Sequence, residues 1–460
     1  MLDSVPPRPL PISVKAGWAS GVLGSGTMLV LANVLLLYFL VSHVGLSPAV
    51  AGLILFATRI YDMASDVVMG VLSDRIRTRW GRRRPWMLLG AVVSAISTFA
   101  LFNVPRFDSQ GMAAAFVTGV LIVFYTGYTL FNIPHTALAA EMTDDYDERT
   151  SLMAYRTLFS TASGLAAYVG APWLIAYFGA DRAAYGTTAG LFSGVVLLAF
   201  LSAVFFTKRV REIPVETAEL SMREALAVVV QNRPFLLLLG VKLCLYTALS
   251  IVGATQMFAV KYLLGRSEVF FGTMAAVSYV VMLAAIPVWT RIANRYGKST
   301  AMIWGIGTAY AVSHLSWFLA GPLEPVWISL VRMGLAGIGL CTLTLCGYAM
   351  LPDTVDYDYR RTGRQRSGIM AGVYAFIEKT GFALGPAICG FMLESAGFVS
   401  GRDAAQTEGA VDAVRSIIAT GPTIMAFLAL PLLIAYRRYE PDMRRQRLAA
   451  AGVDGRGVAS

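Results

Sequence analysis

Residues 186–207 read GTTAGLFSGVVLLAFLSAVFFT, a run of 22 residues without a charged side chain. About 20 apolar residues are the length that crosses the hydrocarbon core of a bilayer as an α-helix. Similar runs recur along the whole chain, and none alternates polar and apolar residues as a strand of a membrane barrel would. Because backbone polar groups in lipid must be satisfied within the protein, these runs predict a bundle of transmembrane helices.

The composition agrees with a membrane protein. Of the 460 residues, 56% are hydrophobic and 14% are charged, whereas soluble domains carry about 25% charged residues. The net charge of +10 comes from basic residues in short loops between the apolar runs. Such an excess beside membrane spans reports topology, so we expect a lipid bilayer and no nucleic acid as partner. The cysteines lie in apolar runs as packing residues, at positions Cys244, Cys341, Cys346 and Cys389.

We predict about twelve spans, at residues 17–42, 48–72, 84–103, 111–138, 151–177, 186–207, 234–262, 269–295, 299–320, 325–351, 368–396 and 411–436. The loops after even-numbered spans and the C-terminal tail are rich in Lys and Arg, and the odd-numbered loops are poor in them. The positive-inside rule therefore places both termini in the cytoplasm of a multi-pass protein of a bacterial-type inner membrane.

The two halves of the chain echo each other. Gly81-Arg82-Arg83 after span 2 resembles Gly297-Lys298 after span 8, and Tyr146-Asp147 after span 4 resembles Tyr357-Asp358 after span 10. Two parallel six-helix repeats are the architecture of the major facilitator fold. The predicted fold class is thus an all-α membrane protein of this fold, with 12 transmembrane helices in two pseudo-symmetric bundles. The predicted parts are a bundle at 1–207, a cytoplasmic linker at 208–233, a bundle at 234–436 and a cytoplasmic tail at 437–460.

Span 2 carries charged residues in its interior. Arg59, Asp62 and Asp66 are spaced i, i+3, i+7 and share one helix face. An ionisable group in the bilayer interior costs at least about 2.5–3.5 kcal/mol, so such groups are functional candidates by default. Two carboxylates one turn apart repel unless a cation, a proton or an arginine relieves the charge. We interpret the pair as a Na⁺ or H⁺ site, and the alternative is a structural pair neutralised by Arg59.

Further polar residues lie within the apolar runs. Lys379 is well inside span 11, where it could hold the substrate or link cation occupancy to substrate occupancy, although a snorkelling lysine is the alternative. Weaker candidates for cavity residues, each with a packing or ion-pairing alternative, are Arg156, Asn132, His135, Lys242 and Arg332.

Acidic and basic residues recur in the predicted cytoplasmic loops of both halves. We predict that they form ion-pair networks that hold the cytoplasmic side closed; solvated loop charges, each pair worth well under about 1 kcal/mol, are the alternative. The candidates are Asp74, Arg75, Arg82, Asp145, Asp147, Arg149, Asp353 and Asp356.

These residues resemble the glycoside-pentoside-hexuronide:cation symporter family over nearly the whole chain. The matching motifs are Arg59-Ile-Tyr-Asp-Met-Ala-Ser-Asp66, Asp74-Arg75 with Trp80-Gly-Arg-Arg-Arg-Pro-Trp86, Asn132-Ile-Pro134, Asp353-Thr-Val-Asp-Tyr357 and Phe376-Ile-Glu-Lys-Thr-Gly381. The resemblance implies that Asp62 and Asp66 are cation ligands and that Ser65 and Thr129 complete an oxygen set, which suits Na⁺ as well as H⁺. It also implies that Lys379 lies by the cation site and Arg156 near the sugar.

The chain departs from the sugar-binding members of this family at their substrate residues. Where they have acids in spans 1 and 4, this chain has Gly24-Ser-Gly-Thr27 and Asn132, and the positions of their stacking tryptophans hold Thr136 and Thr344. A galactoside is therefore not the expected cargo.

The resulting prediction is a symporter coupled to Na⁺, Li⁺ or H⁺ that carries a sugar, glycoside or related small solute by alternating access. Arg59, Lys379 and the residues at the substrate positions are its coupling and substrate candidates. The alternative is a carrier of an amphipathic or lipid-like molecule. We expect no cofactor beyond the coupling ion. An enzyme is not expected, because the chain has no HExxH motif and no nucleophile elbow.

Overall fold

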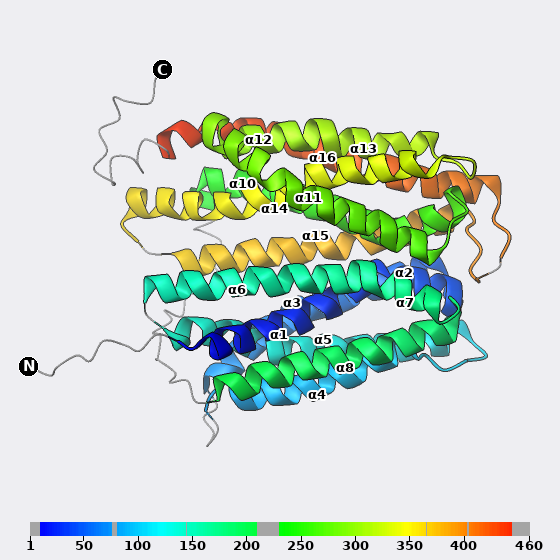
Figure 1. The fold of residues 1–460 in the computed structure, drawn as a ribbon, viewed down its shortest axis with the longest axis horizontal. Helices are drawn as coiled ribbons and strands as arrows, with labels where there is room; N and C mark the ends of the chain where they lie inside the picture. Colours follow the sequence, from blue (N-terminus) through cyan, green and yellow to red (C-terminus); the bar gives the residue numbers. More distant parts are fainter. Residues whose placement is uncertain are drawn as a thin grey trace, which may run out of the picture. The chain divides into compact units, whose positions relative to one another are not determined.

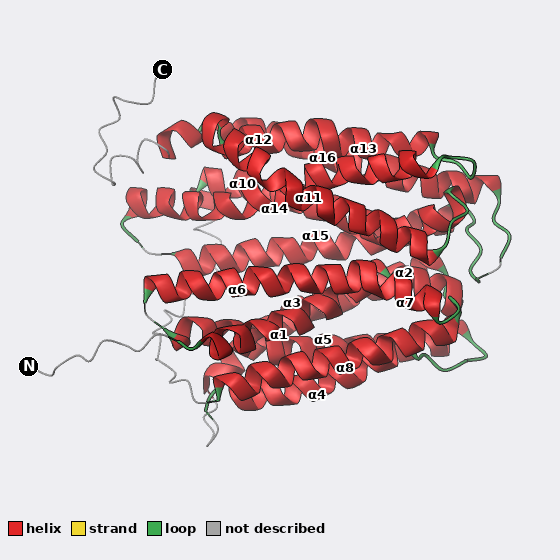
Figure 2. Cartoon of the chain, in the orientation of Figure 1, coloured by secondary structure: helices red, strands yellow, loops and turns green. Residues whose placement is uncertain are grey.

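The computed structural model describes residues 10–75, 81–143, 145–208, 230–364, 366–402 and 404–443. The regular elements within these ranges are helices (Figure 2). The chain divides into two compact units, Met1–Thr217 with Ser400–Asp403, and Ala218–Val399 with Ala404–Ser460. Each unit is described by itself.

Within the residues described above, unit 1 contains six helical rods (Figure 1). In chain order they are α1 (Ile12–Val34) continued by α2 (Leu36–Phe39) and the π-helix η1 (Leu40–Val44); α3 (Pro48–Arg75); α4 (Arg84–Phe102); α5 (Gln110–Met142); α6 (Tyr146–Leu165) continued by the π-helix η2 (Ala166–Gly170) and α7 (Ala171–Tyr177); and α8 (Arg182–Thr207).

The described part of unit 2 also contains six rods. They are α10 (Arg233–Phe258) with the π-helix η3 (Ala259–Leu263); α11 (Glu268–Tyr296); α12 (Lys298–Trp304) with η4 (Gly305–Tyr310), α13 (Ala311–Leu315) and η5 (Ser316–Leu319); α14 (Val326–Thr362); α15 (Ser367–Ser395); and α16 (Glu408–Arg437).

The rods of the two units pack in the same order. In unit 1, α1 contacts α6 and α8, α5 contacts α3 and α4, and α4 contacts α8. In unit 2 the equivalent rods make the equivalent pairs: α10 contacts α15 and α16, α14 contacts α11 and the rod of α12 and η4, and that rod contacts α16. The shared pairing confirms the two pseudo-symmetric six-helix bundles predicted from the sequence.

The first rod of each unit ends in the same way. The backbone N–H of Leu46 donates to the carbonyl of Leu40, and that of Arg266 donates to Val260, both at 3.0 Å. The chain leaves each π-helical turn through a glycine in the left-handed region, Gly45 with φ 86° and Gly265 with φ 61°. A residue with a Cβ is strained there, so glycine is the favoured residue at both ends.

The helices have the length and composition of membrane spans. In the part of the chain that the structure describes, nine helices are long and apolar enough to cross a bilayer, and the first rod, bent by 48°, makes a tenth. The two other rods of the twelve are α3, which carries the charged face of Arg59, Asp62 and Asp66, and the rod of α12 to η5. The structure therefore has a helix at each predicted span, as expected for a multi-pass membrane protein.

Candidate cation- and substrate-binding site

Arg59 and Asp62 on α3 are buried inside unit 1, at 4% and 0% exposure. The Arg59 guanidinium lies 3.4 Å from Asp62 Oδ2 and donates to Asn33 Oδ1 on α1 at 3.0 Å. Its Cζ atom stands 5.0 Å from the ring centroid of Tyr125 on α5. Three helices thus hold the guanidinium beside one carboxylate, and the 3.4 Å ion pair is longer than the 2.7–2.9 Å of a tight charge-assisted bond.

Thr129 on α5 joins the two acids. Its hydroxyl lies 2.9 Å from Asp66 Oδ1, 3.4 Å from Asp62 Oδ1 and 3.2 Å from Ser65 Oγ. Ser65 in turn donates to the backbone carbonyl of Asp62 at 2.9 Å. The four residues predicted as cation ligands therefore converge where α3 packs along α5. Their oxygens are hard donors, the kind that suits an alkali cation or a proton.

The charged residues of this cluster do not balance one another in formal charge. Arg59, Asp62 and Asp66 carry one positive and two negative formal charges, so the cluster has a net charge of −1 when both acids are ionised. Among the described residues, no group of three or more His, Cys, Asp or Glu side chains is arranged to hold a metal ion. One monovalent cation, or one proton, balances the formal charge of these three residues.

The other candidates in unit 1 do not join the cluster in one contact network. Asn132 is half-buried and Thr136 exposed on α5, and Arg156 is exposed on α6. His135 is a packing residue: its ring stacks on Trp18 and Phe131 at centroid distances of 5.1 and 5.0 Å, and its Nε2 lies 2.7 Å from the Trp18 carbonyl oxygen.

Lys379 on α15 and Thr344 on α14 belong to unit 2, so their distances from the acidic pair are not defined. Thr344 donates to the carbonyl of Cys341 in its own helix at 3.1 Å. Lys379 is half-buried, next to a residue that the sequence analysis did not single out as a site, Glu378.

Glu378 forms a polar centre in unit 2 with Lys242 of α10. The Lys242 ammonium lies 2.6 Å from Glu378 Oε2, and the two side chains are 1% and 27% exposed. The ammonium also lies over the ring of Tyr374, 3.1 Å from its centroid, with the rings of Tyr246 and Tyr348 at 4.9 and 5.3 Å. The Tyr348 hydroxyl donates to Glu378 at a long 3.3 Å. A cation–π contact out of water is worth about 2 kcal/mol, so the tyrosines stabilise the position of the ammonium beside Glu378.

A second ion pair in the same unit is buried, and both oxygens of its carboxylate accept hydrogen bonds. Arg332 of α14 donates to both oxygens of Glu324, at 2.9 and 2.7 Å, and to Ser316 Oγ at 2.8 Å. Both side chains are 5% exposed or less. A carboxylate accepts about four hydrogen bonds. The described residues supply Glu378 with one short and one long donor and leave it partly exposed, so of these two pairs the Lys242–Glu378 pair is the one whose acid can accept from a ligand.

Ion pairs recur at the same place in both repeats. In unit 1, Glu141 at the end of α5 pairs with Arg82 at 2.5 Å and with Arg83 at 2.8 Å. In unit 2, Lys298 pairs with Asp353 of α14 at 2.7 Å. The sequence analysis missed Glu141, which lies near the end of α5 and, in the sequence repeat, one residue from the position that matches Asp353 of α14.

The remaining gate candidates make local contacts or lie outside the description. Asp145 accepts from the Glu148 N–H at 2.8 Å and caps α6, and Arg149 donates to the Thr143 carbonyl at 3.0 Å. Asp147 and Asp356 are exposed. The side chains of Asp74 and Arg75 lie outside the described residues. The ion pairs just described each join residues of one unit, so the gate stays a prediction.

Comparison with known proteins agrees with this fold. The family model described as "MFS/sugar transport protein" matches residues 17–438. "Inner membrane symporter YicJ" of Escherichia coli is 28% identical, over 93% of this chain and 92% of the relative. "Putative glycoside/cation symporter YagG" of the same organism is 29% identical, over 82% of each. "Isoprimeverose transporter" of Lactiplantibacillus pentosus is 24% identical, over 90% of this chain and 86% of the relative.

Solved structures share the fold. A bacterial homologue of the human drug peptide transporters superposes with a TM-score of 0.67 at 14% identity, over 94% of this chain and 99% of that one. A nucleoside transporter superposes with a TM-score of 0.63 at 15% identity, over 92% and 98%. At these identities the likeness shows the fold alone. With the family model spanning almost the whole chain, this protein belongs to the glycoside-pentoside-hexuronide:cation symporter family of the major facilitator superfamily.

Proposed function

We propose that this transporter couples the uptake of a sugar, glycoside or related hydroxylated solute to a Na⁺ or H⁺ gradient by alternating access. The observation that carries the proposal is the convergence of two carboxylates and two hydroxyls, from Asp62, Asp66, Ser65 and Thr129, within membrane-spanning helices. Carboxylate and hydroxyl oxygens are hard donors, the kind that binds an alkali cation or a proton. Binding of the coupling ion to this oxygen set then favours the state that can close.

The second unit supplies the proposed substrate contact. Glu378 lies in the interior of α15 and keeps 27% of its side chain exposed. A carboxylate at that depth does not face hydrocarbon, so its open side faces water. It can accept hydroxyl hydrogens of a substrate while the exposed ring of Tyr348 packs against the C–H face of a sugar. The printed names of relatives, a glycoside/cation symporter and an isoprimeverose transporter, support a carbohydrate cargo.

Uptake into proteoliposomes tests the coupling. Radiolabelled candidates, including isoprimeverose, xylose and glucuronides, are offered with an inward Na⁺, Li⁺ or H⁺ gradient, or with none. We expect uptake against a concentration gradient only when the coupling cation gradient is present. Asp62→Asn should abolish this accumulation, and Asp412→Asn, at an exposed acid of α16, should not. Accumulation that survives in Asp62→Asn would remove the acidic pair from the mechanism.

The cargo is tested separately. Purified protein is heated with each sugar of the panel and with lysophospholipids, and the unfolding temperature is recorded. A ligand that binds only the native state stabilises it by RT ln(1 + [L]/Kd), so the unfolding temperature rises with ligand concentration. Stabilisation by the hydroxylated ligands supports the proposal, whereas stabilisation by lysolipids alone assigns the cargo to the lipid-like class.

A further inference from the structure

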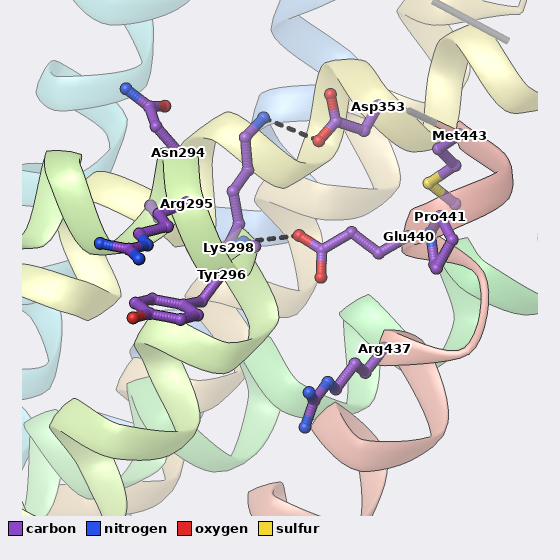
Figure 3. A pocket seen from close by; sticks show the side chains of 11 residues that line it. Asn294, Arg295, Tyr296, Lys298, Asp353, Arg437, Glu440, Pro441 and Met443 are labelled. Atoms are coloured by element: carbon purple, nitrogen blue, oxygen red, sulfur yellow. Dashed lines mark hydrogen bonds and ion pairs between the residues drawn. The ribbon is translucent and has the colours of Figure 1, made fainter. Parts of the chain in front are cut away.

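A pocket of about 580 Å³ lies in unit 2 where α11 meets α12, beside the end of α16 (Figure 3). Arg295, Tyr296 and Lys298 line one part of it, and Asp353, Arg437 and Glu440 another. Neither the cation cluster nor the Lys242–Glu378 pair contributes to its lining.

The acids of the pocket are already engaged. Asp353 pairs with the Lys298 ammonium at 2.7 Å. Glu440 accepts the Lys298 backbone N–H at 2.5 Å, that of Ser299 at 3.4 Å, and the Ser299 hydroxyl. These are the first N–H groups of α12, where the partial positive charge of the helix stabilises a carboxylate. The two acids therefore do not compensate the arginines of the pocket.

Arg295 and Arg437 are exposed and form no ion pair with any residue that the structure describes. They come from different helices, α11 and α16; in Figure 3 the Arg295 side chain extends away from Lys298 and Glu440, and the Arg437 side chain does not point toward it. Each guanidinium is a fork of donors that suits the acceptor oxygens of a phosphate group. The sequence adds Arg438, Arg444, Arg445 and Arg447 directly after Arg437.

An apolar surface continues from each arginine along its helix. Ile434 lies one turn before Arg437 and is 53% exposed, and Val288 lies two turns before Arg295 and is 54% exposed. A free phosphate ion would gain nothing from this surface. A phospholipid would, because its acyl chains cover the apolar face while its phosphate reaches the guanidinium groups. Tyr296, also exposed, is of the residue type enriched at the bilayer interface.

We propose that this pocket binds the phosphate of an anionic phospholipid headgroup from the cytoplasmic leaflet. Clusters of basic residues at the cytoplasmic ends of spans attract anionic lipid at about 1 kcal/mol per Lys or Arg. Unit 2 thereby carries a lipid site at the junction of α11, α12 and α16, whose lining includes the Lys298–Asp353 ion pair.

Native mass spectrometry of the delipidated full chain tests the site. Protein in detergent is titrated with dioleoyl-phosphatidylglycerol, with dioleoyl-phosphatidylcholine, and with inorganic phosphate. We expect a phosphatidylglycerol adduct that forms at a concentration about tenfold lower than the phosphatidylcholine adduct. Equal affinity for the two lipids, or phosphate binding as tight as that of phosphatidylglycerol, overturns the proposal.

The double variant Arg295→Gln/Arg437→Gln should lose this preference and keep its unfolding temperature in lipid-free detergent. The control Arg266→Gln/Arg415→Gln removes the same charge at the opposite ends of α11 and α16, and it should retain the preference. A preference that survives in the first variant, or disappears equally in both, shows that the net charge and not the pocket attracts the lipid. If the first variant does not fold, Arg295→Lys/Arg437→Lys replaces it in the test. This variant keeps the positive charge and removes the forked guanidinium contacts. It should retain part of the preference for phosphatidylglycerol.

Discussion

Thr129 is the residue that contacts both acids of α3. Its side chain contacts Asp62, Asp66 and Ser65, but a hydroxyl has a single proton to donate. That proton goes most favourably to Asp66 at 2.9 Å, which leaves the Thr129 oxygen lone pairs facing the remaining oxygens. The cluster is therefore rich in acceptors, the composition that a bound cation needs.

Thr129→Val removes this hydroxyl and keeps the shape of the side chain. A hydrogen bond to a charged group contributes about 1.5 kcal/mol, so the cation concentration for half-maximal uptake should rise about tenfold. Thr126→Val is the control, because Thr126 lies one turn away on α5 and bonds to Tyr61 at 2.7 Å. The measurement is uptake as a function of external Na⁺ and of pH. Equal effects of the two variants would exclude a ligand role for Thr129.

The buried pair of unit 2 allows a charge-balance test. Lys242→Met leaves Glu378 without its ammonium and should lower stability by about 3 kcal/mol, because an uncompensated charge remains in a low-dielectric site. Adding Glu378→Gln removes that charge and should recover most of the loss. The readout is thermal unfolding of the two single variants and the double variant in detergent. Simple addition of the two single effects would show that the residues do not interact.

At the scale of elements, α15 and α10 approach each other through glycine. A Cβ at Gly385 would lie 2.5 Å from the backbone carbonyl carbon of Ser250 on α10. At Gly381 it would lie 2.8 Å from the Cβ of Tyr246. Small residues permit this closeness between membrane helices, where packing replaces the hydrophobic drive. The approach also sets the Lys242–Glu378 contact, since Lys242 and Glu378 lie on these two helices.

Gly385→Ala should destabilise the protein by about 1–3 kcal/mol, because the backbone of α10 must move to make room. Gly372→Ala, on the same helix, meets nothing within 4 Å and should be neutral or stabilising by about 0.5–1 kcal/mol. The measurement is the unfolding temperature of each variant in detergent, compared with that of the unsubstituted protein. A Gly385→Ala protein as stable as the unsubstituted one would contradict the described closeness of α15 and α10.

At the scale of the whole molecule, the repeat explains why features come in pairs. Each unit has the same helix pairing, a first rod ended by a left-handed glycine, and an ion pair between the loop after its second rod and its fourth rod. The cluster of Asp62, Asp66, Ser65 and Thr129 breaks the pattern, because it belongs to unit 1, while unit 2 has the lysine–glutamate pair. The units are thus alike in scaffold and different in polar chemistry, in keeping with the proposed symport of two solutes.

The orientation of the whole chain is tested by labelling. Asp108→Cys lies in the loop between α4 and α5, and Arg364→Cys follows α14. The four native cysteines lie in apolar helices and three of them are buried, which keeps background labelling low. With the termini in the cytoplasm, a membrane-impermeant maleimide should label Asp108→Cys in intact cells and Arg364→Cys only after lysis. The reverse pattern would invert the topology.

The sequence by itself determined the class, the spans and the exceptional status of Asp62 and Asp66. A helix that crosses a bilayer needs a certain length and internal hydrogen bonds for its backbone groups. A charged residue within such a helix is rare and therefore stands out in the sequence. Ser65 and Thr129 entered as ligands only through the family resemblance, because hydroxyls are common in membrane helices and carry no comparable signal.

Only the tertiary structure decided which side chains meet. Thr129 is far from Asp66 along the chain, and Lys242 is farther still from Glu378, yet both contacts are short. Such meetings depend on which faces of neighbouring helices turn together, and hydropathy alone does not encode that rotation. For the same reason Glu141 was not among the residues predicted from the sequence, and only the structure pairs it with Arg82 and Arg83.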